Sequence, residues 1–235
     1  MPLMTSDGPL TLARDVRLPT FGGSHRSITD AIVEPMWSGV RVVIGAHGLE
    51  AVMFADGEAL DTHVELRNAF AAATARTSDG VIVEAWLTRQ IASGDVGVYT
   101  GADGDLPTTG SLVSQVLLGS RADRLRTKTV ELEAAQAARE LDGDDPVNLV
   151  VVDLLWLDGQ WLLDVPLLER KRILESVVPA GVLIRPGIHV KPPIDGWVGS
   201  WRAQGFTGLT FRAANSRYRP GEAATDWATA PMPRR

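Results

Sequence analysis

A glutamate, a glycine and an arginine stand at fixed offsets in the stretch 33–41, directly before an apolar, β-branched run. They are Glu34, Gly39 and Arg41, and the run is Val42-Val43-Ile44. This spacing suits a charged nucleophile held at the mouth of a strand. The residue at that position is Met36, whose thioether is not one of the side chains that act as covalent nucleophiles. We therefore expect the protein to work without a nucleophile there.

Other residues that could do chemistry are few. The 235-residue chain has no cysteine, which excludes disulfides, thiolate metal sites and cysteine nucleophiles. Its four histidines lack ligand spacing, so no metal site is expected. The only lysines are Lys128, Lys171 and Lys191. We expect Lys128 and Lys171 to face solvent on helices, and Lys191 precedes two prolines, so none fits a nucleophile position.

Composition describes an ordinary globular chain. With 45% apolar and 22% charged residues, it can bury a core as one larger domain or two small ones. A net charge of −6 argues against attraction of the whole surface to nucleic acid, although a local basic face would not change that sum. No stretch approaches the roughly twenty apolar residues of a membrane span, and the N-terminus lacks a signal-peptide pattern. We expect a cytoplasmic protein with no membrane association.

The elements that must position these residues are strands and helices without βαβ regularity, which favours an α+β fold. Residues 1–30 are expected to form a loop-like N-terminal arm. The run 147–157 is almost continuously apolar and indicates a strand buried on both faces. The predicted strands are 40–44, 50–54, 81–87, 96–99, 147–157, 182–184, 188–190 and 208–212. The predicted helices are 63–75, two within 111–141, 166–178 and 196–204, and the tail from residue 213 is predicted to be a loop.

Several stretches resemble the adenylation domain of ATP-dependent DNA ligases, in the covalent nucleotidyltransferase superfamily that includes RNA ligases and mRNA capping enzymes. The most specific are Val152-Asp153-Leu154-Leu155-Trp156-Leu157-Asp158-Gly159, the Pro-Leu-x-x-Arg stretch 166–170, the Ser-x-Tyr-x-Pro-Gly loop 216–221 and Trp227. The resemblance implies an ATP-grasp-like adenylation-domain fold, with antiparallel and mixed sheets flanked by helices. It also implies one domain over residues 31–235, without the OB-fold domain that follows in the family.

In this family a lysine attacks the α-phosphate of ATP, with help from Mg²⁺, to give lysyl-AMP. The nucleophile motif reads Glu-x-Lys-x-Asp-Gly-x-Arg. Glu34, Gly39 and Arg41 match it, but Met36 replaces the lysine and Ser38 the aspartate. The resemblance therefore implies a protein that does not adenylate itself.

Further family positions are replaced as well. Trp86 stands at the glutamate of an Asp-Gly-Glu strand that aligns with Glu84-Ala85-Trp86. In the Glu-Gly-x-x-x-Lys strand we assign Thr207 to the acid and Phe211 to the lysine. Thr229 replaces the first lysine of the last motif, and Val152 the aromatic residue that stacks on adenine. We expect the ancestral nucleotide pocket to be filled by apolar side chains, namely Met36, Trp37, Trp86 and Phe211.

Some positions remain that could meet a nucleotide. They are Glu34, Trp37, Arg41 and Val152. Arg41 could contact a phosphate or ribose, or could be a solvated arginine at a strand edge. Asp153 is expected to be a hydrogen-bonded structural carboxylate in its buried strand. The arginine clusters 121–128 and 212–219 either bind phosphate backbone or form solvated faces.

The main hypothesis is a non-catalytic ligase-like protein that acts through binding nucleotide, DNA or protein in DNA repair or replication. Its expected partner is DNA or a DNA-repair protein, and it needs no cofactor. One alternative is a working ATP-dependent DNA ligase or nucleotidyltransferase with unconventional residues, which would use ATP and Mg²⁺. A third is an ATP sensor that binds without turnover. The sequence leaves the oligomeric state open.

Overall fold

The computed structural model describes residues 8–90 and 147–233 of the protein. The helices are α1 (Pro9–Leu12), the 3₁₀ turn η1 (Ala13–Asp15), α2 (Val64–Thr74), α5 (Leu167–Val177) and α6 (Asp195–Ala203). The strands are β1 (Thr20–Phe21), β2 (Ala31–Pro35), β3 (Val40–His47), β4 (Glu50–Ala55), β5 (Glu58–Ala59), β6 (Val81–Thr88), β7 (Asn148–Leu157), β8 (Gln160–Trp161), β9 (Ile184–Pro186), β10 (Gly208–Ala213), β11 (Ala223–Ala224) and β12 (Trp227–Pro231).

The larger sheet follows the order β5-β4-β3-β6-β7-β8, with β9 added beside β7. Its neighbours are antiparallel except for the β7–β9 pair, which is parallel. Strand β7 is buried along nearly its whole length, as its apolar run predicts. Helix α2 packs on this sheet through Leu66 and Phe70, which belong to the same core as Val83 and Leu154.

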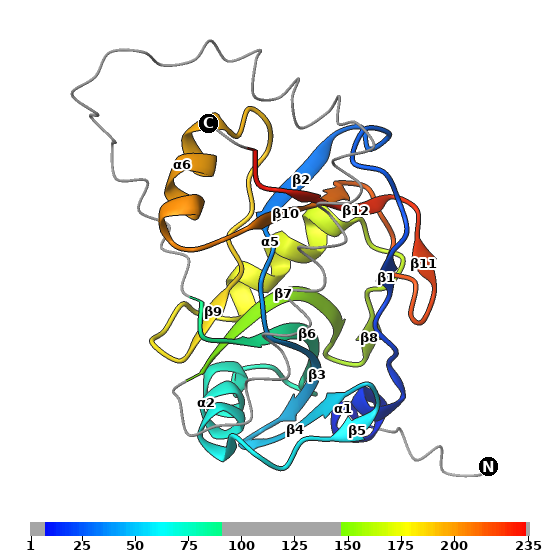
Figure 1. Ribbon diagram of the computed structural model, residues 1–235. Helices are drawn as coiled ribbons and strands as arrows, with labels where there is room; N and C mark the ends of the chain where they lie inside the picture. The colour runs from blue at the N-terminus through cyan, green and yellow to red at the C-terminus, as the bar shows by residue number, and fades with distance from the viewer. Residues whose placement is uncertain (1–7, 91–146, 234–235) are drawn as a thin grey trace.

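A smaller antiparallel sheet has the order β12-β10-β2, and a short parallel pair, β1–β11, lies beside it. Figure 1 shows α5 between the two sheets, with β7 on one side and β2 and β10 on the other. Leu167 of α5 shares a small buried cluster with Ile32 of β2 and with Ala214. Helix α6 packs on the smaller sheet, since Val198 and Trp201 lie in one core with β2 and β10 residues. This mixed arrangement confirms the predicted α+β fold class.

Most predicted elements lie where the pattern placed them, including β3, β4, β6, β7 and β10 and the helices α2, α5 and α6. The predictions for 96–99 and 111–141 fall outside the described residues. The loop prediction from residue 213 onward was wrong because β12 forms there. Its sequence, Trp-Ala-Thr-Ala-Pro, has weak strand propensity, and pairing with β10 supplies the order.

Two further predictions need correction. Residues 1–30 contain helical turns at α1 and η1 and the short strand β1, not only loop. The expected strands 182–184 and 188–190 are replaced by the single strand β9, while Val190 makes an isolated bridge to Val33. None of the helices within 8–90 and 147–233 is both long and apolar enough to cross a membrane.

Candidate functional site

Glu34 and Arg212 meet on one face of the smaller sheet. In the antiparallel register of β2 and β10, Thr210 lies opposite Glu34 and Arg212 opposite Ile32. Glu34 and Arg212 are therefore diagonal neighbours, within reach of long side chains. The Arg212 Nε donates to Glu34 Oε2 at 3.0 Å, and its Nη2 donates to the same oxygen. Both residues are buried, which makes this a charged pair away from solvent.

Lys171 of α5 binds the second oxygen of the same carboxylate. Its Nζ donates to Glu34 Oε1 and to the backbone carbonyl of Val152 at 2.8 Å. Burial alone would raise the pKa of Glu34, but the charges of Arg212 and Lys171 outweigh it and lower that pKa to about 2. Burial lowers the pKa of Lys171 despite the opposing attraction of Glu34. Burial likewise opposes the charge of Arg212, yet Glu34 and Asp153 raise its pKa.

Asp153 extends this network toward the start of α5. Arg170 binds it with two parallel bonds, Nε to Oδ1 at 2.8 Å and Nη2 to Oδ2 at 2.9 Å. Arg212 Nη1 lies 3.6 Å from Asp153 Oδ2. Such two-pronged arginine–carboxylate pairing fixes geometry as well as charge. Asp153 thus has the structural, hydrogen-bonded role expected from its buried strand.

A second carboxylate cluster lies on the adjacent strands of the larger sheet. Arg41 of β3 binds Glu84 of β6 through Nη2 at 2.7 Å and Nε at 3.2 Å. Its Nη1 donates to the carbonyl of Pro19 at 2.8 Å. The Tyr218 hydroxyl donates to the other oxygen of Glu84 at 2.9 Å. Burial and the Glu84 charge raise the pKa of Tyr218. Arg41 is therefore engaged in an internal ion pair, not solvated at a strand edge.

The opposite face of the smaller sheet is apolar. Trp37, Val152 and Phe211 belong to one buried cluster with residues of β2, β10 and α6, and Trp86 packs against it. The Trp37 and Phe206 rings meet edge to face, with centroids 5.0 Å apart. Met36 is 6% exposed, and its backbone N–H donates to the carbonyl of Gly208. Of the apolar residues proposed from the sequence, Trp37, Trp86 and Phe211 thus pack together on one side of the sheet.

The remaining replaced positions are Ser38, Thr207 and Thr229, which carry short polar side chains. Ser38 is half-buried, and its backbone N–H donates to Gln90 Oε1 at 2.7 Å. Thr207 is exposed before β10, and its carbonyl accepts from the Met232 N–H. Thr229 lies in β12 opposite Thr210.

Two residues that matter most in this network were not found from the sequence. Lys171 was expected to face solvent, but it is 1% exposed and held by Glu34. Arg212 was placed in an arginine cluster that binds phosphate backbone or faces solvent, but it is buried. Phe211 was assigned to the lysine position, although Arg212 is the sixth residue counted from Thr207 and the cation of β10. The family motif Glu-Gly-x-x-x-Lys has six residues, so counting from Thr207 would have assigned its lysine position to Arg212.

The described residues hold no group of three or more His, Asp or Glu side chains suited to a metal ion. The carboxylates of Glu34, Asp153 and Glu84 are each taken up by arginine or lysine donors. Chemically, the site is a set of satisfied ion pairs beside a packed apolar cluster. Lys171 supplies the one amine of this network. It binds Glu34, two residues before Met36, and burial lowers its pKa.

Comparison with known proteins agrees with the resemblance seen in the motifs. A family model described as ATP dependent DNA ligase domain matches residues 116–229. The DNA ligase of Methanocorpusculum labreanum is 32% identical over 88 residues, which are 37% of this chain and 16% of that protein. The multifunctional non-homologous end joining protein LigD of Mycolicibacterium smegmatis is 35% identical over 83 residues, 34% of this chain and 10% of that protein.

Solved structures extend the likeness over the fold. The ligase domain of LigD from M. tuberculosis superposes with a TM-score of 0.58 at 17% identity, over 92% of this chain and 59% of that one. A mycobacterial DNA ligase D complexed with ATP and MES gives a TM-score of 0.59 at 17% identity, over 92% and 60%. The chain thus spans well under two thirds of the length of these relatives. The ligase adenylation-domain resemblance is confirmed at the level of sequence motifs and fold.

Proposed function

We propose that this protein, which resembles the adenylation domain of ATP-dependent DNA ligases in motifs and fold, does not form lysyl-AMP and acts by binding. The class of partner is DNA or a protein of DNA repair or replication, in keeping with the names of its relatives.

One observation carries this proposal. Met36 stands at the nucleophile position, and Glu34, two residues before it, is bound on both carboxylate oxygens by Lys171 and Arg212. Groups that handle a nucleotide must be free to meet it, whereas these are satisfied by one another inside the protein. Breaking such a buried ion pair to admit a ligand costs free energy of about 3–5 kcal/mol.

The test is incubation with ATP labelled at the α-phosphate, in the presence of Mg²⁺, followed by denaturing electrophoresis. The wild-type protein and Met36→Lys are both expected to remain unlabelled, with an active ATP-dependent DNA ligase as the positive control. The single substitution is expected to fail because Ser38, Trp86 and Thr229 differ from the family pattern too. Labelled Met36→Lys protein would show that the site is not dismantled.

A second candidate function rests on Lys171. Its buried amine has a lowered pKa and lies against Glu34 and the Val152 carbonyl, two positions that the family resemblance places near the nucleotide. In this alternative the Lys171 lone pair attacks the α-phosphorus of ATP, an N–P bond forms, pyrophosphate leaves and the amine loses a proton. Wild-type protein would then become labelled, and Lys171→Met would not.

Binding of ATP without turnover is measured separately. A ligand that binds only the native state raises its free energy of unfolding by mass action, by about 2.7 kcal/mol at one hundred times its Kd. Thermal melting with millimolar ATP distinguishes a sensor from a protein that has lost the nucleotide site.

Titration with labelled nicked duplex DNA over a range of salt concentrations tests the DNA partner, since phosphate contacts weaken as salt rises.

A further inference from the structure

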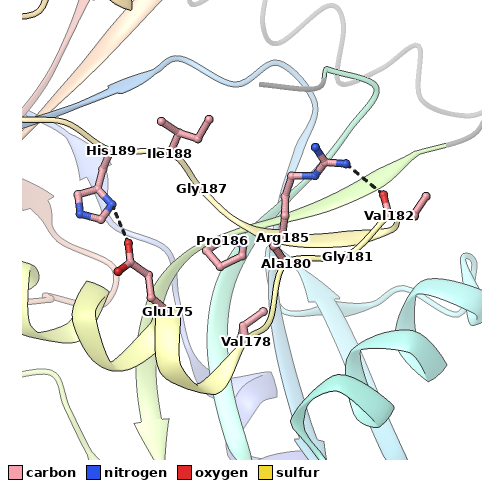
Figure 2. A pocket seen from close by; sticks show the side chains of 10 residues that line it. All are labelled: Glu175, Val178, Ala180, Gly181, Val182, Arg185, Pro186, Gly187, Ile188 and His189. Carbon is pink, nitrogen blue, oxygen red and sulfur yellow. Dashed lines mark hydrogen bonds and ion pairs between the residues drawn. The ribbon is translucent and has the colours of Figure 1, made fainter. Parts of the chain in front are cut away.

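A pocket of about 730 Å³ opens at the C-terminal end of α5. It is built from the last turns of α5, the following connection and the strand β9 with the residues after it (Figure 2). Its lining side chains combine an apolar floor with charged groups at the two ends. A concave surface of this size with a few convergent polar groups is a candidate binding site.

The cationic end of the pocket is Arg185 of β9. Its Nη2 donates to the carbonyl of Val182 at 3.2 Å, which fixes the direction of the guanidinium (Figure 2). Its Nε–H is buried and has no hydrogen-bond acceptor. A buried donor without a partner costs free energy that an incoming acceptor would recover. A carboxylate is the group that best matches the planar fork of arginine donors.

The other end of the pocket holds His189 and Glu175. The His189 Nδ1 lies 3.7 Å from Glu175 Oε1, and Figure 2 shows this pair at the far side of Pro186 and Gly187 from Arg185. Burial and the charge of Lys171 lower the pKa of His189, so its imidazole is neutral at pH 7. Glu175 is exposed and negative, which disfavours a polyphosphate or a nucleic-acid backbone. A single carboxylate, held at the Arg185 end, is compatible with it.

Between these ends the surface is apolar. Val178 is fully buried at the floor, and Pro186 and Ile188 line the walls. Val182 is 84% exposed and Leu183 37% exposed at the edge of the pocket. Exposed aliphatic side chains beside a hollow are a feature of protein interaction sites. An occupant therefore needs large apolar side chains as well as an acidic group.

Strand addition to β9 is not how this occupant binds. The inner edge of β9 is paired with β7, and its outward carbonyl at Ile184 already accepts from the Gly181 N–H. Pro186 has no N–H to offer. The sheet edge is thus closed to a further strand, and recognition must come through side chains inserted into the pocket.

We propose that this pocket binds a segment of a partner protein in which an acidic side chain lies next to a large apolar one. The carboxylate pairs with the guanidinium of Arg185, and the apolar side chain packs on Pro186 and Ile188 above the buried Val178. The charge of Arg185 is complementary to the carboxylate of the segment, and the exposed Val182 is complementary to its apolar side chain. Glu175 repels ligands with several negative charges. The site is independent of whether the protein adenylates itself.

The test is selection of phage-displayed random heptapeptides on the immobilised full-length protein, followed by fluorescence polarisation with the enriched peptides. We expect enrichment of sequences that place Asp or Glu beside Leu, Ile, Phe or Trp. Arg185→Gln should weaken binding at least tenfold, and Val182→Ser should weaken it to a lesser extent. Arg172→Gln is the matched control, because Arg172 is an exposed arginine of α5 that pairs with Glu169 and does not line the pocket.

Two controls accompany this test. The thermal unfolding midpoints of the variants must match that of the wild type. A peptide whose acidic residue is replaced by glutamine must bind the wild-type protein as weakly as the original peptide binds Arg185→Gln. Lack of enrichment, or peptides that bind Arg185→Gln and wild type equally well, would overturn the proposal. So would displacement of the peptides by ATP or duplex DNA, because the pocket would then be a general anion site.

Discussion

The two faces of the β12-β10-β2 sheet are both buried but held together by different forces. One face carries Leu209 and Phe211, which pack with Trp37 and helix α6. The other carries Arg212, together with Glu34 from the neighbouring strand, which bind one another and Lys171. Strand alternation alone separates the two environments, since successive residues point to opposite faces. A single residue step along β10 therefore passes from an apolar core to an ionic one.

This difference bears on how each face responds to substitution. Apolar packing tolerates replacements of similar volume, whereas a buried ion cluster fails when one member is removed. Here the charged face consists of groups that satisfy each other, while the apolar face packs Trp37 and Phe211 in one buried cluster. The two faces therefore make separable predictions.

The largest expected effect comes from Glu34→Gln on the charged face. It leaves two buried cations, Lys171 and Arg212, without their shared counter-charge, so the free energy of unfolding should fall by about 5 kcal/mol, the upper end for a broken buried pair. Urea unfolding at pH 7 measures this. Glu169→Gln is the control, because its pair with Arg172 is largely exposed and is worth no more than about 1 kcal/mol.

A compensated variant sharpens the same point. Replacing the three residues together, as Glu34→Leu, Lys171→Met and Arg212→Met, removes every charge that would be left unpaired by a single change. Apolar replacement of a buried ion cluster is often neutral or stabilising. The triple variant should therefore be more stable than Glu34→Gln alone. If it is less stable, the ion cluster itself holds the two sheets together.

Leu209→Ala on the apolar face should cost about 3–4 kcal/mol, through lost burial and the cavity it leaves in the cluster with Trp37. Its effect should be the same at pH 7 and pH 4, because the residues of that cluster do not titrate. If the loss of unfolding free energy differs strongly between the two pH values, the apolar face is coupled to the ionic face, and the two faces are not independent. The comparison is made by urea unfolding of wild type and variant at both pH values.

The sequence predicted the elements of these faces better than their contacts. Hydrophobic periodicity located β7, β10 and α5 because burial and local pattern agree there. It placed Lys171 in solvent because Arg170 and Arg172 flank it, and a run of charges on a helix is ordinarily a solvated face. The partner that buries Lys171 is Glu34, 137 residues earlier in the chain. A pairing so distant in sequence leaves no trace in local periodicity.

The family motifs were informative where spacing was strict. They marked Glu34, Arg41 and Asp153, each of which the structure places in an ion pair. They did not mark Glu84 or Tyr218 as partners of one another, since the two lie on separate elements 134 residues apart. The open pocket beside β9 gave no sequence signal, because Glu175 at the end of α5 meets Arg185 and His189 around one cavity only through the turn after α5.

Acid should weaken the charged face by about 3 kcal/mol. Glu34 has a folded-state pKa of about 2 against 4.5 when exposed, so its contribution is fully present above pH 5 and is lost as the pH falls through 4.5 toward 2. Unfolding free energies of the wild type, measured from pH 6 to pH 2.5, should show this loss. In Glu34→Gln this decrease in unfolding free energy between pH 6 and pH 2.5 should be smaller by the same amount. A decrease as large as that of the wild type would mean that other carboxylates cause it.

The smallest effect, about 2 kcal/mol, is expected for Tyr218→Phe, which removes one hydrogen bond to the buried Glu84 carboxylate and keeps the ring against Trp227. Arg41 still neutralises Glu84 in this variant, so the loss stays well below that of Glu34→Gln. Because burial and Glu84 raise the pKa of Tyr218 above 10, its stabilisation is present below pH 10 and declines as the pH rises further. Urea unfolding at pH 7 and pH 10.5 should therefore show the gap between wild type and Tyr218→Phe narrowing at the higher pH. A gap of constant size would mean that the hydroxyl of Tyr218 contributes through packing and not through its bond to Glu84.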